Sequence, residues 1–238
     1  MAHISQAAHS RAGRRGRPHS PLRAPFLLFV GLTALAAGYV AYVLWPNWPG
    51  APVSLEAPAL PIVVADEMFN IEPAASRQSV QRRPGTQQRV DLAYLWPSLT
   101  PPDPALATDA ANPADPNQRL FVTIDDGRNE LPPVERVKTI YPRYLSPATT
   151  AQPDGLTSRA FRDGTPYQGE DLIYQDTNAD DFTARCSRSG VGNSGMCLLA
   201  RRIGHADITV RFPRDWLADW KKVLYGIDRV LARLHPDK

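Results

Sequence analysis

Three carboxylates lie close together in the second half of the chain and are suited to acid–base chemistry. Asp125 and Asp126 are adjacent, and Glu130 follows four residues later. Two carboxyl groups with different pKa values can act as general acid and general base, as in hydrolases and transferases. The same cluster, with Gly127 and Asn129, is also typical of a turn that solvates the end of a strand. The sequence leaves both interpretations open.

Cys186 and Cys197 are the only cysteines of the chain. An even pair in an exported protein typically forms a disulfide. The two flank the glycine-rich segment 189–195 on the arms of a predicted hairpin, and if they face each other, Ala184 pairs with Leu199. A bridge closing this loop stabilises by roughly 2–3 kcal/mol in the chain-entropy model. A catalytic or metal-binding pair is the weaker interpretation, because the spacing is not that of a CxxC motif. We predict a structural disulfide.

The acidic segment Asp176–Asp181 imitates the start of a calcium-binding loop, with oxygen-bearing side chains at alternate positions. The glycine that such a loop requires is replaced by Asp181, and the glutamate at its twelfth position is replaced by Ser187. We favour an acidic surface turn over a calcium site and predict no metal ligand.

Nucleophilic catalysis has little support in the sequence. Ser194 lacks the G-x-S-x-G pattern of a nucleophile elbow. Beyond the apolar N-terminal segment the only histidines are His205 and His235, and a catalytic triad would have to use the first of them. Neither a glycine-rich phosphate loop nor a zinc signature occurs. We predict no catalytic residue and no cofactor.

The environment of all these residues depends on one apolar segment, Phe26–Leu44, which has no charged residue. As a helix it is about 29 Å long, close to the ~30 Å hydrocarbon core of a bilayer. Five arginines and no acidic residue precede it, which places the N-terminus in the cytoplasm by the positive-inside rule. We assign the membrane anchor to Phe26, Leu27, Leu28, Phe29, Val30, Leu44 and Trp45. The sequence thus predicts a single-pass inner-membrane protein with a periplasmic C-terminal domain.

The sequence allows three other interpretations of this segment. A cleaved signal peptide usually has a shorter apolar region, and the bulky residues before Pro46 are a poor cleavage context, although a cut after Ala41 stays open. Arg14 and Arg15 suggest a twin-arginine signal but lack its apolar continuation. A buried core helix would have a polar face, which this segment lacks.

The formal net charge of +3 is concentrated at the N-terminus. Residues 1–25 carry five arginines, whereas the rest of the chain carries 22 basic and 24 acidic residues. A basic tail beside an apolar helix is suited to anionic lipid headgroups. It has no aromatic or folded recognition partner for nucleic acid. We therefore predict the lipid bilayer as a partner and no nucleic acid.

The composition predicts four regions. Residues 1–25 are a basic, disordered cytoplasmic tail and residues 26–44 are the anchor. Residues 45–117, in which prolines are frequent, are predicted to be a spacer with short strands. Residues 118–238 are predicted to be the periplasmic domain.

Alternating and β-branched runs predict strands at residues 60–65, 68–71, 89–96 and 119–124, and a hairpin turn at Asp66 and Glu67. Further strands are predicted on both sides of the loop 163–169 and in a three-stranded meander over residues 182–212. Pro132 and Pro133 are suited to starting a short helix. Residues 213–234 carry a broad apolar stripe with two tryptophans, typical of an amphipathic helix. We predict an α+β fold in which this helix packs on an antiparallel sheet.

The sequence does not identify an activity. The favoured interpretation is a membrane-anchored periplasmic protein that binds or scaffolds other envelope proteins. Thr33, Ala37 and Ala41 recur at the spacing that lets membrane helices approach closely, which would support self-association. The alternatives are an envelope hydrolase or transferase with a carboxylate site, and an accessory subunit of a larger inner-membrane complex.

Overall fold

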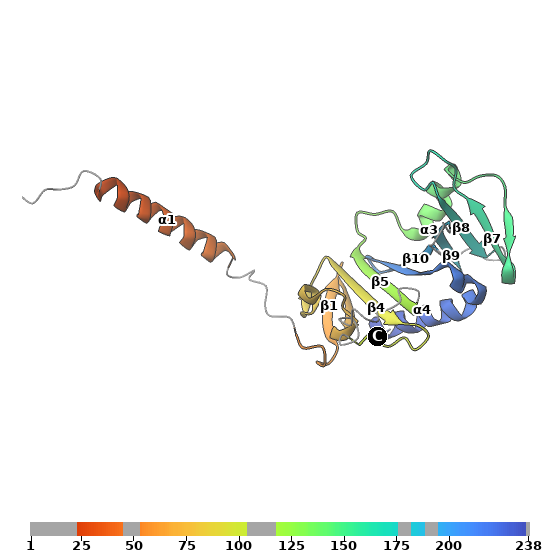
Figure 1. Cartoon of the computed structure of the whole chain (residues 1–238), viewed down its shortest axis with the longest axis horizontal. Helices are drawn as coiled ribbons and strands as arrows, with labels where there is room; N and C mark the ends of the chain where they lie inside the picture. The colour runs from red at the N-terminus through yellow and green to blue at the C-terminus, as the bar shows by residue number, and fades with distance from the viewer. Residues whose placement is uncertain (1–22, 45–52, 104–117, 176–181, 189–194, 237–238) are drawn as a thin grey trace, which may run out of the picture. The chain divides into compact units, whose positions relative to one another are not determined.

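The computed structural model describes residues 23–44, 53–103, 118–175, 182–188 and 195–236. The chain divides into two compact units, Met1–Pro49 and Gly50–Lys238. Among the described residues, the first unit contains helix α1 (Arg23–Leu44), and the second contains the strands and the other helices. Figure 1 shows these elements in chain order, coloured from red to blue.

Helix α1 contains the stretch Pro25–Val43, which has a mean hydropathy of 2.0 and is long and apolar enough to cross a membrane. Its large apolar side chains are exposed. The hydroxyl of Thr33 donates to the carbonyl of Phe29 at 2.9 Å, so this polar group is satisfied within the helix, as a lipid environment requires. A helix of this kind serves either as a membrane anchor or as a signal sequence. Trp45 lies outside the described residues.

The second unit contains two sheets. The small sheet has the strand order β2-β1-β3, and the large sheet has the order β4-β5-β11-β10-β9-β8-β7-β6. All neighbours in the large sheet are antiparallel. The strands are β1 (Leu60–Val64), β2 (Glu67–Ile71), β3 (Gly85–Thr86), β4 (Arg89–Leu95), β5 (Arg119–Asp126), β6 (Thr150–Gln152), β7 (Leu156–Ala160), β8 (Glu170–Gln175), β9 (Thr183–Ser187), β10 (Met196–Ile203) and β11 (Ala206–Pro213).

The helices of this unit are short apart from the last one. They are η2 (Pro73–Ala75), η3 (Ser79–Gln81), α3 (Pro133–Glu135), η5 (Arg136–Ile140), η6 (Tyr141–Arg143), η7 (Pro153–Gly155), η8 (Arg214–Asp219) and α4 (Trp220–Leu234). The α+β prediction is confirmed: one apolar N-terminal helix is followed by a large antiparallel sheet and a C-terminal helix.

Helix α4 packs its apolar stripe on one face of the large sheet, which we call the core face. Trp220, Val223, Ile227, Val230 and Leu234 are buried against sheet residues of the same cluster. The amphipathic pattern therefore predicted both the helix and its buried side. The chain enters α4 through the 3-10 turn η8, so the regular helix begins seven residues after Pro213.

The indole of Trp216 stacks on that of Trp96, with ring centres 4.9 Å apart. Trp96 directly follows β4, so this contact joins the start of the C-terminal helical segment to the edge of the large sheet. Both rings are half-buried against the main core. Such aromatic pairs stabilise beyond the area that they bury.

The strands upstream of residue 118 belong to the same compact unit as those downstream. β1 and β2 form the predicted hairpin, but the chain turns at Ala65 and Asp66, which have positive φ, and Glu67 already belongs to β2. β4 pairs with β5 along its whole length. From the sequence we predicted β4 in the spacer and β5 in the periplasmic domain. Val90 and Leu92 of β4 are fully buried. Their burial explains why this proline-rich region folds with the sheet.

The predicted turn at Asp125 and Asp126 starts later than we expected. β5 continues through both residues, because Asp125 pairs with Asp207 and Asp126 pairs with Ala206 on β11. The chain turns only after Gly127, whose N–H donates to the carbonyl of His205 at 3.0 Å.

The face of the large sheet opposite α4, here called the outer face, is partly polar because side chains alternate along each strand. Its paired positions form a row in which three arginines are separated by apolar side chains. This row consists of Arg159, Leu172, Arg185, Leu198, Arg211, Phe121 and Ala93, on β7, β8, β9, β10, β11, β5 and β4.

Candidate binding surface

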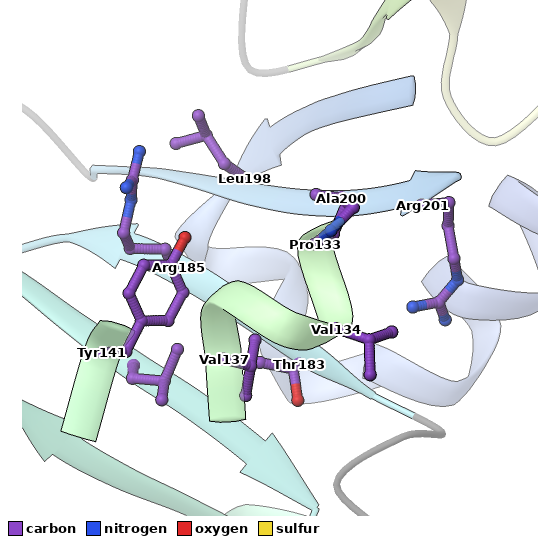
Figure 2. A pocket seen from close by; sticks show the side chains of 10 residues that line it. Pro133, Val134, Val137, Tyr141, Thr183, Arg185, Leu198, Ala200 and Arg201 are labelled. Carbon is purple, nitrogen blue, oxygen red and sulfur yellow. The ribbon is translucent and has the colours of Figure 1, made fainter. Parts of the chain in front are cut away.

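A short helical segment, residues 133–143, covers the middle of the outer face. It begins at Pro133, as the sequence predicted, because proline has no N–H to satisfy at a first helical position. It continues as single turns through Arg143, past Pro142. Figure 2 shows this segment in front of β9 and β10, with side chains from both sides lining one pocket.

This pocket is a small cavity of about 50 Å³. Val134, Val137 and Tyr141 line it from the helical segment, and Leu198 and Ala200 line it from β10 (Figure 2). Pockets for small molecules usually measure about 300–1,000 Å³. The cavity is therefore a packing gap beneath the helical segment and not a substrate site.

Four tyrosines gather next to this cavity and form a second, smaller core. Tyr141, Tyr144, Tyr167 and Tyr174 pack around Leu145, Phe161 and Leu172. Tyr141 meets Tyr167 edge-on at 5.2 Å, and Tyr144 meets Tyr167 at 5.7 Å between ring centres. All four tyrosines are only half-buried.

Arg185 of β9 joins this cluster from the sheet. Its guanidinium carbon lies 4.9 Å from the ring centre of Tyr167 and 6.0 Å from that of Tyr141. Its Nε lies 2.7 Å from Oε2 of Glu170, which fixes the side chain from a second direction. Figure 2 shows Arg185 beside the Tyr141 ring. We call Tyr141, Tyr144, Tyr167, Tyr174 and Arg185 the tyrosine–arginine surface.

Burial raises the pKa of the Tyr167 phenol, and neighbouring Tyr141 adds to this effect. The phenol is therefore neutral at physiological pH and keeps its O–H as a donor. Tyrosine and arginine are the residue types enriched at protein interfaces, because each combines a large contact area with a polar end. A cluster whose rings and guanidinium already hold one another is also ordered before any partner arrives, which lowers the entropic cost of binding.

The sequence alone did not identify this surface. The helical segment brings Tyr141 and Tyr144, the loop between β7 and β8 brings Tyr167, and β8 brings Tyr174. The alternation of side chains along β8 and β9 indicates that Tyr174 and Arg185 point to the outer face. No local sequence pattern indicates that the four tyrosines lie together.

The predicted carboxylate cluster lies in a different place, at one end of the outer face. Asp125, Asp126 and Glu130 line the same cleft, of about 600 Å³, together with Asp207 and arginines of β4 and η5. The structure thus brings the three predicted carboxylates together.

Arginines hold most of the carboxylates in this cleft. Asp126 accepts from Nε of Arg128 at 3.0 Å. Asp207 lies 2.6 Å from Nε of Arg202 and 3.1 Å from Nη2 of Arg136. Such pairing is typical of a structural ion-pair network.

Asp125 also faces an arginine, but at a longer distance: its Oδ1 lies 3.6 Å from Nη1 of Arg89. Burial raises its pKa, with Asp91 and Asp207 adding to the effect. By contrast, hydrogen bonds from Arg128 lower the pKa of Asp126 to about 2. Two adjacent carboxyls with pKa values moved in opposite directions meet one requirement of an acid–base pair.

Other candidate residues do not join this cleft. His205 is exposed in the turn before β11 and is not among the lining residues. His235 lies at the end of α4, with its Nε2 3.4 Å from Oε2 of Glu67. Ser194 and the acidic segment Asp176–Asp181 lie outside the described residues. In the described ranges no group of three or more His, Cys, Asp or Glu side chains is placed to hold a metal ion.

Cys186 and Cys197 form a disulfide between β9 and β10, with the sulfurs 2.00 Å apart. The predicted register is confirmed, because Ala184 pairs with Leu199 two residues along. Both cysteines are fully buried in the main core. The bridge is therefore part of the packing on the core face and has no exposed sulfur for chemistry.

No protein-family model and no curated protein sequence matches the chain. Among solved structures, the chain shares its fold with Smlt3025, an immunity protein of the Stenotrophomonas maltophilia type IV secretion system, at a TM-score of 0.52 and 16% identity. That alignment covers 74% of this chain and 92% of the other. The Neisseria meningitidis iron-regulated outer membrane lipoprotein FrpD aligns over 76% of this chain and 95% of its own, at 9% identity. Its TM-score of 0.40 is too low to support an argument.

Proposed function

We propose that this chain is a membrane-anchored envelope protein that binds a protein partner through the tyrosine–arginine surface. Helix α1 would be retained as the anchor, with the N-terminus in the cytoplasm and residues 50–238 in the periplasm. The observation that carries the proposal is the contact of Arg185 with both Tyr141 and Tyr167 on the outer face of the sheet. These side chains form an amphipathic patch, and the cavity of about 50 Å³ beneath the helical segment is too small for a substrate.

Two further observations support the proposal. The disulfide favours an oxidising compartment, since cytosolic thiols are kept reduced. The fold is also one that an immunity protein of a secretion system uses. An immunity role is therefore the first specific function to test in this chain, ahead of a scaffold role or a place as an accessory subunit.

Affinity purification of the full-length protein from membranes tests the proposal. We expect a discrete protein to co-purify with the wild type and to be lost with Arg185→Gln. The matched control is Arg229→Gln, because Arg229 also lies over a tyrosine ring, that of Tyr225 on α4, at 5.9 Å. A partner that is retained by Arg185→Gln, or lost equally from both variants, would contradict the role of this surface.

An enzyme is the second candidate function, and the carboxylate cleft favours it. There Asp125, with its raised pKa, would act as general acid beside the ionised Asp126. A hydrolase or transferase of this kind would lose its activity on envelope substrates in Asp125→Asn and keep its activity in Arg185→Gln. The binding function is supported if Arg185→Gln loses the partner and Asp125→Asn changes neither partner binding nor activity.

A further inference from the structure

A second cleft lies beside β4, at the edge of the large sheet. Its volume is about 340 Å³, and it is bounded by the segment that follows β2, by Ala93 of β4 and by the start of β5. Three arginines line it: Arg77, Arg82 and Arg119. Asp103 is the one carboxylate among the lining residues. The lining therefore carries an excess of positive charge.

Contacts within the domain hold two of these arginines in place. The guanidinium carbon of Arg77 lies 4.8 Å from the ring centre of Phe121. Nη2 of Arg82 donates to the carbonyl of Ser76 at 3.2 Å. The fold thus keeps three guanidinium groups around one space, although like charges repel one another.

The same cleft concentrates hydrogen-bonding groups that have no partner. In the described parts of the chain, six buried side-chain nitrogen or oxygen atoms have no hydrogen-bond partner. Three of them belong to residues of this cleft: Nε of Arg82, Nε of Arg119 and Oγ of Ser76. Ser76 lines the cleft and is only 3% exposed. A buried donor without an acceptor destabilises the fold, and an anion placed among these groups would supply the missing acceptor.

We propose that this cleft binds a tetrahedral oxyanion, namely phosphate or a phosphate ester. Guanidinium groups match the oxygen geometry of phosphate and form charge-assisted hydrogen bonds with it. A tetrahedral anion offers four oxygens to donors that arrive from different residues, whereas a carboxylate offers two. The cleft also has room for part of a molecule attached to the phosphate.

This site is separate from the tyrosine–arginine surface. In the large sheet β5, β11 and β10 lie between β4, beside the cleft, and β9, which carries Arg185. The two proposals therefore fail independently, and variants of one site serve as controls for the other.

Calorimetric titration of the full-length protein in non-ionic detergent with inorganic phosphate tests the proposal. We expect saturable binding that weakens about tenfold or more in Arg119→Gln and in Arg77→Gln, because each loses charge-assisted hydrogen bonds. Arg229→Gln removes the same charge from α4 and should bind as the wild type does. Urea unfolding of each variant verifies that the domain is folded.

Repeating the phosphate titration with the protein in lipid nanodiscs distinguishes a lipid headgroup from a soluble phosphate as the natural ligand. A weaker apparent affinity with phosphatidylglycerol than with phosphatidylcholine would assign the cleft to a lipid headgroup, and an equal affinity would assign it to a soluble phosphate. Both results support the site. An absence of binding up to about 10 mM phosphate, or equal binding by the wild type and Arg119→Gln, would overturn it.

Discussion

The guanidinium carbon of Arg185 lies 4.9 Å from the centre of the Tyr167 ring, and its Nε lies 2.7 Å from Oε2 of Glu170. The aromatic ring and the carboxylate thus fix one cation from two directions. Glu170 also pairs with Ser187 across β8 and β9, so the sheet itself sets the position of this group. An ordered arginine among half-buried tyrosines is the feature on which the proposed binding function rests.

The variant Arg185→Gln should remain folded. Its ion pair with Glu170 is partly exposed, at 25% and 24% of the two side chains. We expect a loss of about 1 kcal/mol in the free energy of unfolding, since partly solvated pairs contribute little. Urea unfolding followed by tryptophan fluorescence measures this. A loss of several kcal/mol would mean that Arg185 serves mainly to hold the fold, and lost partner binding would then not locate the interface.

Reduction of the disulfide should destabilise the domain without unfolding it. Cys186 and Cys197 are 11 residues apart, and opening a loop of this size costs roughly 2–3 kcal/mol in the chain-entropy model. We expect Cys186→Ala/Cys197→Ala to lower the denaturation midpoint and to keep the wild-type circular dichroism spectrum. Mass spectrometry of protein from its native compartment checks the oxidation state, and two free thiols there would contradict export to an oxidising compartment.

Asp91 should make the domain sensitive to acid. Its carboxylate is buried and accepts from Arg89 and Thr123, with Arg89 the main cause that lowers its pKa to about 2. Because the pKa of Asp91 is lower in the folded protein than its ordinary value of 3.8, the ionised carboxylate stabilises the fold at pH values above 3.8. This contribution is lost as the pH falls toward 2.

The comparison of wild type with Asp91→Asn isolates this effect. We expect the wild type to be more stable by about 2 kcal/mol at pH 7 and the difference to shrink toward pH 2. Urea midpoints between pH 2 and pH 7 measure it. A difference that does not change with pH would show that the charge of Asp91 contributes nothing.

Gly226 should resist substitution although it lies within α4. A Cβ atom at this position would lie 2.6 Å from Cζ3 of Trp96, whose ring stacks on Trp216 and cannot easily move. Alanine favours a helix over glycine by about 1 kcal/mol, but overpacking typically costs 1–3 kcal/mol. We therefore expect Gly226→Ala to lower the thermal midpoint.

The same substitution in a Trp96→Ala variant shows whether the contact with Trp96 is the reason for the destabilisation. With Trp96→Ala, which removes the obstructing ring, Gly226→Ala should become neutral or stabilising because only helix propensity remains. If Gly226→Ala stabilises the wild type as well, the close approach of α4 to Trp96 is not a constraint.

The sequence predicted those elements whose partners are close along the chain. The β1–β2 hairpin, the pairing of β9 with β10 and the buried stripe of α4 follow from local alternation, turn residues and the cysteine pair. The pairing of β4 with β5 did not follow, because 23 residues separate Leu95 from Arg119 and no local pattern selects that partner. No local pattern indicates either that Asp91 is buried by hydrogen bonds from Gln81 and Thr123.

The candidate sites were less predictable than the fold. The carboxylates converge because they are neighbours in the sequence, and the structure added only Asp207 and the arginines. The four tyrosines and Arg185 come from four separate elements, and the arginines of the phosphate cleft come from β5 and from the segment between β2 and β3. Long-range contacts between strands and loops bring them together, which a single sequence does not reveal.

Site-specific photo-crosslinking in living cells tests the central claim most directly. A photoreactive phenylalanine derivative would replace Tyr144, on the tyrosine–arginine surface, or Tyr225, which is 67% exposed on α4. We predict a discrete protein adduct from position 144 that is absent from position 225 and is lost when Arg185→Gln is added. No adduct at position 144, or the same adducts at both positions, would contradict a protein interface at this surface.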